Sequence, residues 1–132
     1  MCFAFVVLMG VRPAQAGNAS TLVHWINKAR AQENLPPLKV HPDLVDDARS
    51  HAANMAKRGS SFNHPNLRSV IAGRVRLTHF SERSRSLLQA FEGALRSTRH
   101  RAQIYGDYEY IGVGVVRSGD YFYMCWFLMD PA

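Results

Sequence analysis

The chain has 132 residues, of which 47% are hydrophobic and 20% are charged, a composition that excludes a disordered, collagen-like or multi-span membrane protein. Sixteen Lys and Arg residues against ten Asp and Glu residues give a net charge of +6, which favours anionic partners. Two cysteines cannot build a disulfide scaffold, so a single domain of this size must be held together by its hydrophobic core.

The first residues have the pattern of a secretory signal peptide. An unbroken apolar run at 2–9 is followed by Ala-Gln-Ala at 14–16, which places small residues at the two positions that a signal peptidase reads. The run is shorter than the roughly 20 residues that span a bilayer. We therefore expect removal of residues 1–16 and secretion of an extracellular domain, residues 17–132, without a transmembrane span. The alternative is that the run forms a buried strand or helix.

Two amphipathic helices are predicted in the first half of this domain. The first covers about Thr21 to Glu33 and ends before Leu-Pro-Pro-Leu at 35–38, because this sequence cannot continue a helix. The second runs from Pro42, which is tolerated in a first helical turn, to about Arg58, where Gly59 supplies the stop. Leu-Lys-Val at 38–40 is a candidate strand between the two helices.

The second half is predicted to contain a long loop, a third helix and a β-hairpin. Residues 60–83 show no sustained hydrophobic period, and loops of that length are usually functional. Helical spacing returns at 84–97 and is followed by a basic connector at 96–103. Alternating apolar residues then flank Ser-Gly-Asp at 118–120, which predicts a hairpin. Helices first and a hairpin last indicate an α+β domain with antiparallel pairing.

Cys125 is the second of the two cysteines and lies in the last strand of the predicted hairpin. Its neighbours, from Tyr121 to Met129, are almost all bulky and apolar. This surrounding predicts an inert, buried thiol rather than a link to another chain.

Several motifs occur in a fixed order along the chain. They are Ala48-Arg-Ser-His-Ala-Ala-Asn-Met55, then Phe62-Asn-His64, then Ser97-Thr-Arg-His-Arg-Ala-Gln-Ile104 leading into Tyr110-Ile-Gly-Val-Gly-Val115. Together they resemble the CAP superfamily of cysteine-rich secretory, antigen five and pathogenesis-related proteins, in its bacterial SCP-like form. The resemblance covers nearly all of residues 22–129. It implies an α-β-α sandwich with a small antiparallel sheet, and a cleft floored by two histidines and two acidic side chains.

The resemblance assigns cleft residues one by one. His64 matches the first cleft histidine and His100 the second, whereas His51 matches a helix position that supports the cleft from behind. Ser97, which opens the Ser-x-x-His-Arg motif, is a second supporting residue. The Gly-Glu-Asn signature of the family is absent, and Glu82 is the candidate to replace its glutamate. The alternative interpretations are a loop histidine at 64, a helix-capping histidine at 100 and a core histidine at 51.

The two cleft histidines set limits on metal chemistry. A tight zinc site takes three or four protein ligands, and His64 and His100 supply only two. Arg99 and Arg101 flank His100, and their positive fields disfavour both a bound cation and a protonated imidazole. We therefore expect no tightly bound cofactor. Zinc, with His64 and His100 as its ligands, is considered only for the alternative that the protein is a hydrolase.

The stretch between Asn66 and Gln103 holds eight arginines against Glu82 and Glu92. Guanidinium groups suit carboxylates and phosphates, so Arg99 and Arg101 are predicted to form an anion-binding rim beside the cleft. For an exported protein these anions would be cell-wall polymers, acidic glycans or lipid head groups. The alternative is a solvated arginine-rich face.

Taken together, these patterns favour a secreted, monomeric binding module rather than an enzyme. Its ligand would be an anionic or amphipathic component of the cell envelope, such as wall or membrane anions or a lipid-like molecule, held in the cleft around His64 and His100. Nucleic acid is not an expected partner because no reader motif is present. The alternative is a hydrolase in which His64, His100 and Glu82 act on a wall or ester substrate, with or without zinc. A third interpretation is a stable scaffold without a cleft.

Overall fold

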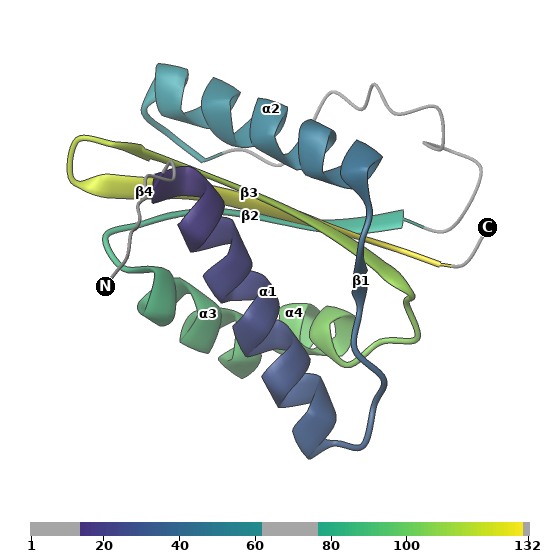
Figure 1. The fold of residues 1–132 in the computed structure, drawn as a ribbon. Helices are drawn as coiled ribbons and strands as arrows, with labels where there is room; N and C mark the ends of the chain where they lie inside the picture. Colours follow the sequence, from purple (N-terminus) through teal and green to yellow (C-terminus); the bar gives the residue numbers. More distant parts are fainter. Residues whose placement is uncertain (1–13, 62–76, 131–132) are drawn as a thin grey trace, which may run out of the picture.

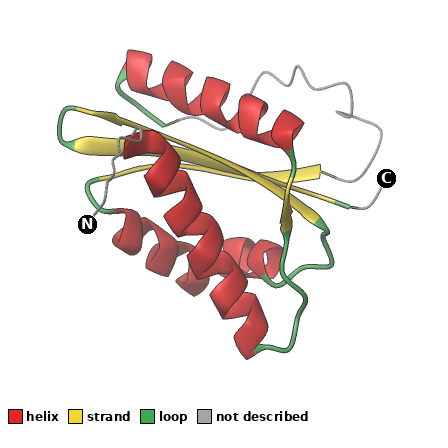
Figure 2. Ribbon diagram, viewed as in Figure 1, coloured by secondary structure: helices red, strands yellow, loops and turns green. Residues whose placement is uncertain are grey.

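The chain forms one sheet enclosed between two layers of helices. The computed structural model describes residues 14–61 and 77–130. In chain order the elements are α1 (Ala14–Gln32), β1 (Lys39–Val40), α2 (Pro42–Arg58), β2 (Leu77–Ser84), α3 (Leu87–Arg96), α4 (Thr98–Ile104), β3 (Tyr110–Ser118) and β4 (Tyr121–Met129). Helix α2 covers one face of the sheet, and α1, α3 and α4 cover the other (Figures 1 and 2). This is the α+β sandwich that the sequence predicts.

The strand order in the sheet is β1-β3-β4-β2, and the sheet is mixed. The predicted hairpin of β3 and β4 is present and β2 pairs antiparallel with β4, but the short β1 runs parallel to β3, which corrects the expectation of a purely antiparallel sheet. Strand β2 also corrects the prediction of a loop that reaches position 83. Only Phe80 of its residues 78–84 is buried, so this edge strand shows no hydrophobic alternation in the sequence.

The helices match the predicted ones with two corrections. Helix α2 has the predicted bounds, and Gly59 ends it in a left-handed conformation at φ +69°. Helix α1 begins at Ala14 rather than Thr21. The Thr21 hydroxyl lies inside the helix and donates back to the Gly17 carbonyl at 2.9 Å instead of capping it. The predicted basic connector at 96–103 is largely the helix α4.

A clasp of polar side chains joins the end of α1 to the rest of the domain. Asn27 accepts from the Leu38 N–H at 2.8 Å and donates to the Leu38 carbonyl at 3.2 Å. Arg30 is only 2% exposed, and its guanidinium donates to the carbonyls of Pro36, Ile104 and Gly106 at 2.8–3.0 Å. The clasp fixes the turn after α1 and the C-terminal end of α4 in one place.

Alternating side chains of β4 separate two hydrophobic cores. Met124, Trp126 and Leu128 face the layer of α1, α3 and α4, whereas Cys125 and Phe127 face α2. Cys125 is fully buried, and burial raises the pKa of its thiol to about 12. The prediction that Cys125 is buried is therefore confirmed, and its inertness stays a prediction.

Two glycines of β3 let α2 lie directly on the sheet. A Cβ added at Gly112 would overlap the backbone of Leu44, and one added at Gly114 would overlap the backbone of Ala48. Neither obstacle is the far end of a flexible side chain, so neither can move without shifting α2. The Ile-Gly-Val-Gly-Val sequence thus sets the distance between helix and sheet.

We expect Gly114→Ala to destabilise the domain by about 2–3 kcal/mol, because the added methyl group forces α2 away from β3. The matched control is Gly93→Ala in α3, where an added Cβ meets nothing within 4 Å. Alanine is the better helix former by about 1 kcal/mol, so this control should stabilise the protein. Urea unfolding of both variants checks the prediction, and an unchanged free energy of unfolding for Gly114→Ala would contradict it.

Candidate functional site

Ser97 places His100 in the first turn of α4. Its hydroxyl accepts from the His100 N–H at 3.5 Å, and its own N–H bonds to carbonyls at the end of α3. Serine is a favoured residue at a helix start for this reason. The role of Ser97 in the structure is thus to end one helix, begin the next and orient the residue that was predicted as the second cleft histidine.

The His100 imidazole rests on an aromatic stack. Its ring meets Phe80 of β2 edge-on, with centroids 4.8 Å apart at 86°, and Phe80 in turn stacks on Trp126 at 4.1 Å and 18°. The imidazole is half-buried, and burial, followed by the charge of Arg99, lowers its pKa. His100 is therefore a neutral imidazole at neutral pH, with one ring nitrogen that accepts and one that donates.

Glu82 lies on the same face of the sheet as this stack. Phe80 pairs with Trp126 and Glu82 with Met124, and successive strand residues alternate between faces, so both side chains point toward the layer of α1, α3 and α4. The carboxylate is half-buried, and burial raises its pKa. Within residues 14–61 and 77–130 it makes no hydrogen bond or ion pair. The sequence could not assign Glu82 to a side, and the register of β2 does so.

Gln103 is a residue of this region that the sequence analysis missed. It lies one helical turn after His100, is 7% exposed, and donates from Nε2 to the Thr78 hydroxyl at 2.9 Å and the His79 carbonyl at 3.2 Å. Its Oε1 and the indole Nε1 of Trp126 are both buried, and neither has a hydrogen-bond partner among the described residues. Buried polar atoms normally have partners. The signal in the sequence was the spacing of His100 and Gln103, which puts both on one side of a helix.

The structure describes only one of the other two predicted histidines. His64 lies outside the described residues. His51 is 2% exposed on α2, among residues that pack on the Cys125 and Phe127 face of the sheet. His79 of β2 points to that same face, with its ring 5.9 Å from Phe127. The sheet thus separates His51 and His79 from His100, and a supporting role for His51 stays a prediction.

Four of the described arginines between Asn66 and Gln103 form two pairs. Arg99 and Arg101 are exposed on α4 beside His100. Arg83 and Arg85 gather around Tyr121 at the β4 end of the hairpin, where their guanidinium carbons lie 4.4 and 5.3 Å from the ring centroid. A hydrogen bond from Arg85 and the two positive charges lower the pKa of the Tyr121 phenol. Only the first pair flanks the candidate site.

The described residues contain no cluster of three or more His, Cys, Asp or Glu side chains that could hold a metal ion. Of the two predicted ligands the described residues include only His100, whose neutral imidazole has a lone pair for a metal but also has Arg99 beside it. Zinc at His64 and His100 therefore stays a prediction. None of the described helices is long and apolar enough to cross a membrane.

Comparison of the sequence with models of known protein families identifies the family to which the chain belongs. The model of the CAP, or cysteine-rich secretory protein, family matches residues 23–129. The chain therefore belongs to the CAP family, as the order of its motifs indicated. A comparison with curated proteins finds no match.

Solved structures of bacterial proteins share the fold at low sequence identity. An outer surface protein of Borrelia burgdorferi matches with a TM-score of 0.77 and 16% identity, over 94% of this chain and 100% of that one. An extracellular SCP-domain protein of Bacillus anthracis gives 0.69 and 19%, and a cysteine-rich secretory protein of Staphylococcus aureus gives 0.70 and 19%. These matches cover 94% and 92% of this chain but only 45% and 40% of those proteins.

Arg99→Gln should raise the pKa of His100 toward its ordinary value of about 6.5, because the variant removes the nearby charge that disfavours the imidazolium. Burial remains, so the recovery should be partial. The matched control is Arg101→Gln, whose charge is not a cause of the shift. NMR titration of the His100 ring in both variants makes the test, and equal shifts would contradict it.

Proposed function

We propose that the chain is a secreted CAP-type binding module that holds an anionic or amphipathic cell-envelope ligand at a cleft around His64 and His100. The observation that carries the proposal is the position of His100, a half-buried neutral imidazole on an aromatic stack with exposed arginines on either side in the sequence. Such a group can bond to a polar ligand atom, because one of its ring nitrogens accepts a hydrogen bond and the other donates one. Arg99 and Arg101 supply the charge that an anionic head group requires.

Secretion of residues 17–132, with residues 1–16 as signal peptide, is the second part of the proposal. Two of the matching structures are described as an extracellular protein and an outer surface protein, and a third as a secretory protein. The apolar run at 2–9 and the Ala-Gln-Ala sequence at 14–16 support the same location for this chain. The ligand would then be one that is present at the cell envelope.

We expect the protein to bind phosphatidylglycerol vesicles saturably at low salt, and to bind phosphatidylcholine vesicles far more weakly. Each basic residue near an anionic surface contributes about 1 kcal/mol, so the double variant Arg99→Gln, Arg101→Gln should weaken binding roughly thirtyfold. Added salt should weaken it as well. Vesicle sedimentation over a lipid series measures these affinities.

The matched control for this experiment removes the same charge elsewhere. Lys28 on α1 and Arg117 on β3 are both exposed, and replacing both with Gln should reduce binding much less than the α4 variant does. His100→Ala should also weaken binding, although at neutral pH it changes no charge. Equal losses of vesicle affinity in the two double variants would show that binding depends on net charge alone. Absence of saturable, salt-sensitive binding would refute the proposal.

A hydrolase is the second candidate function, and the position of Glu82 is the observation in its favour. Burial raises the pKa of this carboxyl, which favours a proton donor, and lowers the pKa of His100 on the same sheet face, which favours a proton acceptor. The substrate would be an ester or a component of the cell wall. Zinc, held by His64 and His100, would polarise the reacting carbonyl when bound.

If this second function is real, the protein should hydrolyse p-nitrophenyl butyrate, and Glu82→Gln should lower kcat/KM by about a hundredfold or more. A matched control is Glu92→Gln, which removes an exposed carboxylate of α3 and should leave the rate unchanged. Initial rates, with and without added zinc, measure the effect. Turnover that survives the combined His64→Ala and His100→Ala changes would eliminate the hydrolase.

A further inference from the structure

Two arginines and a tyrosine meet at the end of the sheet where the β3–β4 hairpin turns. Arg83 is the second-last residue of β2 and Arg85 follows the strand, and their guanidinium carbons lie 4.4 and 5.3 Å from the centroid of the Tyr121 ring. Both arginines are exposed, and Tyr121 is partly exposed. Contact with the ring restricts the two guanidinium groups before a ligand arrives, which lowers the entropy that binding costs. These three residues are the Tyr121 cluster.

The end of α2 fixes Arg83 a second time. Its Nη1 donates to the carbonyl of Gly59, the residue that ends the helix, at 2.7 Å. The end of α2 and the turn of the hairpin lie at the same end of the molecule in Figure 1. A guanidinium has five N–H donors, so this bond leaves others for a ligand. In the described ranges no ion pair joins Arg83 or Arg85 to a carboxylate.

The Tyr121 hydroxyl is a third hydrogen-bonding group beside the two guanidinium groups. A hydrogen bond from Arg85, followed by the charges of Arg85 and Arg83, lowers the pKa of the phenol. Because the phenol oxygen accepts that bond, its O–H remains able to donate to another group. The charge of Asp120, in the hairpin turn, acts on this pKa in the opposite direction, so one carboxylate near the cluster opposes a bound anion.

The Tyr121 cluster and His100 lie on opposite faces of the sheet. Arg83 pairs with Tyr123, which belongs to the core under α2. Phe80, which contacts the His100 ring, belongs to the other core. The cluster is therefore separate from the site around His100 and does not depend on the function proposed above.

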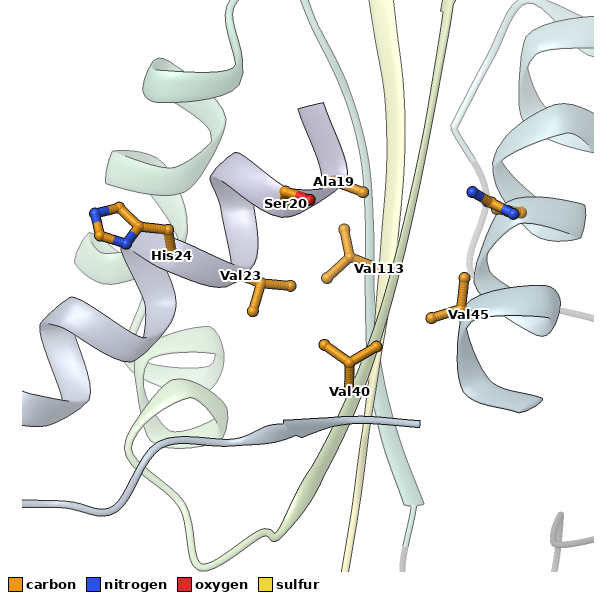
Figure 3. Close-up of a pocket in the computed structure, with 8 residues that line it drawn as sticks. Ala19, Ser20, Val23, His24, Val40, Val45 and Val113 are labelled. Atoms are coloured by element: carbon orange, nitrogen blue, oxygen red, sulfur yellow. The ribbon is translucent and has the colours of Figure 1, made fainter. Parts of the chain in front are cut away.

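The apolar pocket in Figure 3 offers different chemistry. Its volume is about 380 Å³ and its lining is largely aliphatic, with Val23 of α1 and Val45 of α2 on opposite sides of the sheet. Among the described residues that line it, Arg49 is the one arginine. A multiply charged anion would meet one guanidinium there and two at the Tyr121 cluster, which makes the cluster the better anion site.

The number of donor groups at the Tyr121 cluster indicates the kind of anion. A carboxylate or a phosphodiester has a single negative charge and only a pair of free oxygens. A phosphomonoester has three terminal oxygens and a charge of about −1.5 to −2 at neutral pH. Arg83, Arg85 and the Tyr121 hydroxyl offer one donor group to each of these oxygens, and guanidinium forks match the geometry of phosphate.

We propose that Arg83, Arg85 and Tyr121 form a binding site for a phosphomonoester group. The two guanidinium groups and the phenol O–H each donate to a phosphate oxygen, and the bond from Arg83 to Gly59 holds the site against the end of α2. The same group occurs on soluble polyol phosphates and on lipids such as phosphatidic acid, and the site recognises the phosphate in either.

The probe is methyl phosphate, titrated into the full chain at neutral pH and constant ionic strength and followed by NMR. The Nε–H signals of Arg83 and Arg85 and the ring signals of Tyr121 should shift together along one saturable curve. Dimethyl phosphate and acetate, which have less charge and fewer free oxygens, should bind at least roughly fivefold more weakly. No saturable shift, or equal binding of the three anions, would overturn the proposal.

Variants of the protein locate the contact. Arg85→Gln should weaken methyl phosphate binding roughly fivefold, because it removes charge-assisted hydrogen bonds. Arg85→Lys should recover little of this loss, since lysine keeps the charge but lacks the fork. Arg117→Gln is the matched control: Arg117 is exposed near the same hairpin turn, but it lies over Phe122, which packs against the other core. Equal losses in Arg85→Gln and Arg117→Gln would overturn the proposal.

Asp120→Asn tests the opposite direction. It removes the carboxylate that opposes an anion near Tyr121, so it should strengthen methyl phosphate binding roughly twofold. Arg85, Arg117 and Asp120 are all exposed, so thermal unfolding should show that each variant is folded. Unchanged or weaker binding by Asp120→Asn would overturn the placement of the phosphate beside Tyr121.

Two further ligands distinguish the sources of the phosphate. Tighter binding of glycerol 3-phosphate than of methyl phosphate assigns the site to a soluble ligand, and tighter binding of phosphatidic acid vesicles alone assigns it to a lipid. A gain that Arg85→Gln does not remove would overturn the proposal. The double variant Arg99→Gln, Arg101→Gln should leave the shifts that methyl phosphate causes at Tyr121 unchanged, so failure of this site and failure of the function proposed around His100 are distinguishable.

Discussion

The contact between α2 and β3 at Gly112 and Gly114 is the constraint on which the rest of the structure depends. The helix backbone lies where the Cβ atoms of any other residues would be, so no layer of side chains separates the two elements there. This face of the sheet is therefore filled by α2, and His51 is enclosed within it at 2% exposure. In the described part of the chain, the cell-envelope ligand proposed above would therefore lie at the opposite face of the sheet.

The opposite face of the sheet holds the polar groups of the candidate site. Short helix α4 follows α3 with a single Ser97 between them, and the buried Arg30 holds its C-terminal end. His100 is thereby set against Phe80 at the β2 edge, and the β2 register brings Glu82 to the same face. Burial disfavours the charged form of both groups, so it raises the pKa of Glu82 and lowers the pKa of His100.

Sequence patterns predicted those helices and strands whose bounds are set by their own residues. Helix α2 has its proline start and glycine stop, and β3 and β4 have a glycine turn between apolar runs. Strand β2 was missed because its stability comes from pairing with β4 and not from hydrophobic alternation. The site was predictable in part: the motif order found His100, while the stack on Phe80, the side of Glu82 and the contribution of Gln103 depend on the register of β2, which is a long-range property. The separation of His51 from His100 depends on the sheet between them.

The central claim is that the face around His100, and not the α2 face, binds the ligand. The most direct test is a titration of the chain with the short-chain, water-soluble lipid dihexanoylphosphatidylglycerol, followed by NMR signals on both faces. We predict that the His100 ring, the Trp126 indole N–H and the Gln103 side-chain amide shift together, while the His51 ring stays unchanged. Shifts confined to His51 and the α2 face, or none at saturating lipid, would contradict the account.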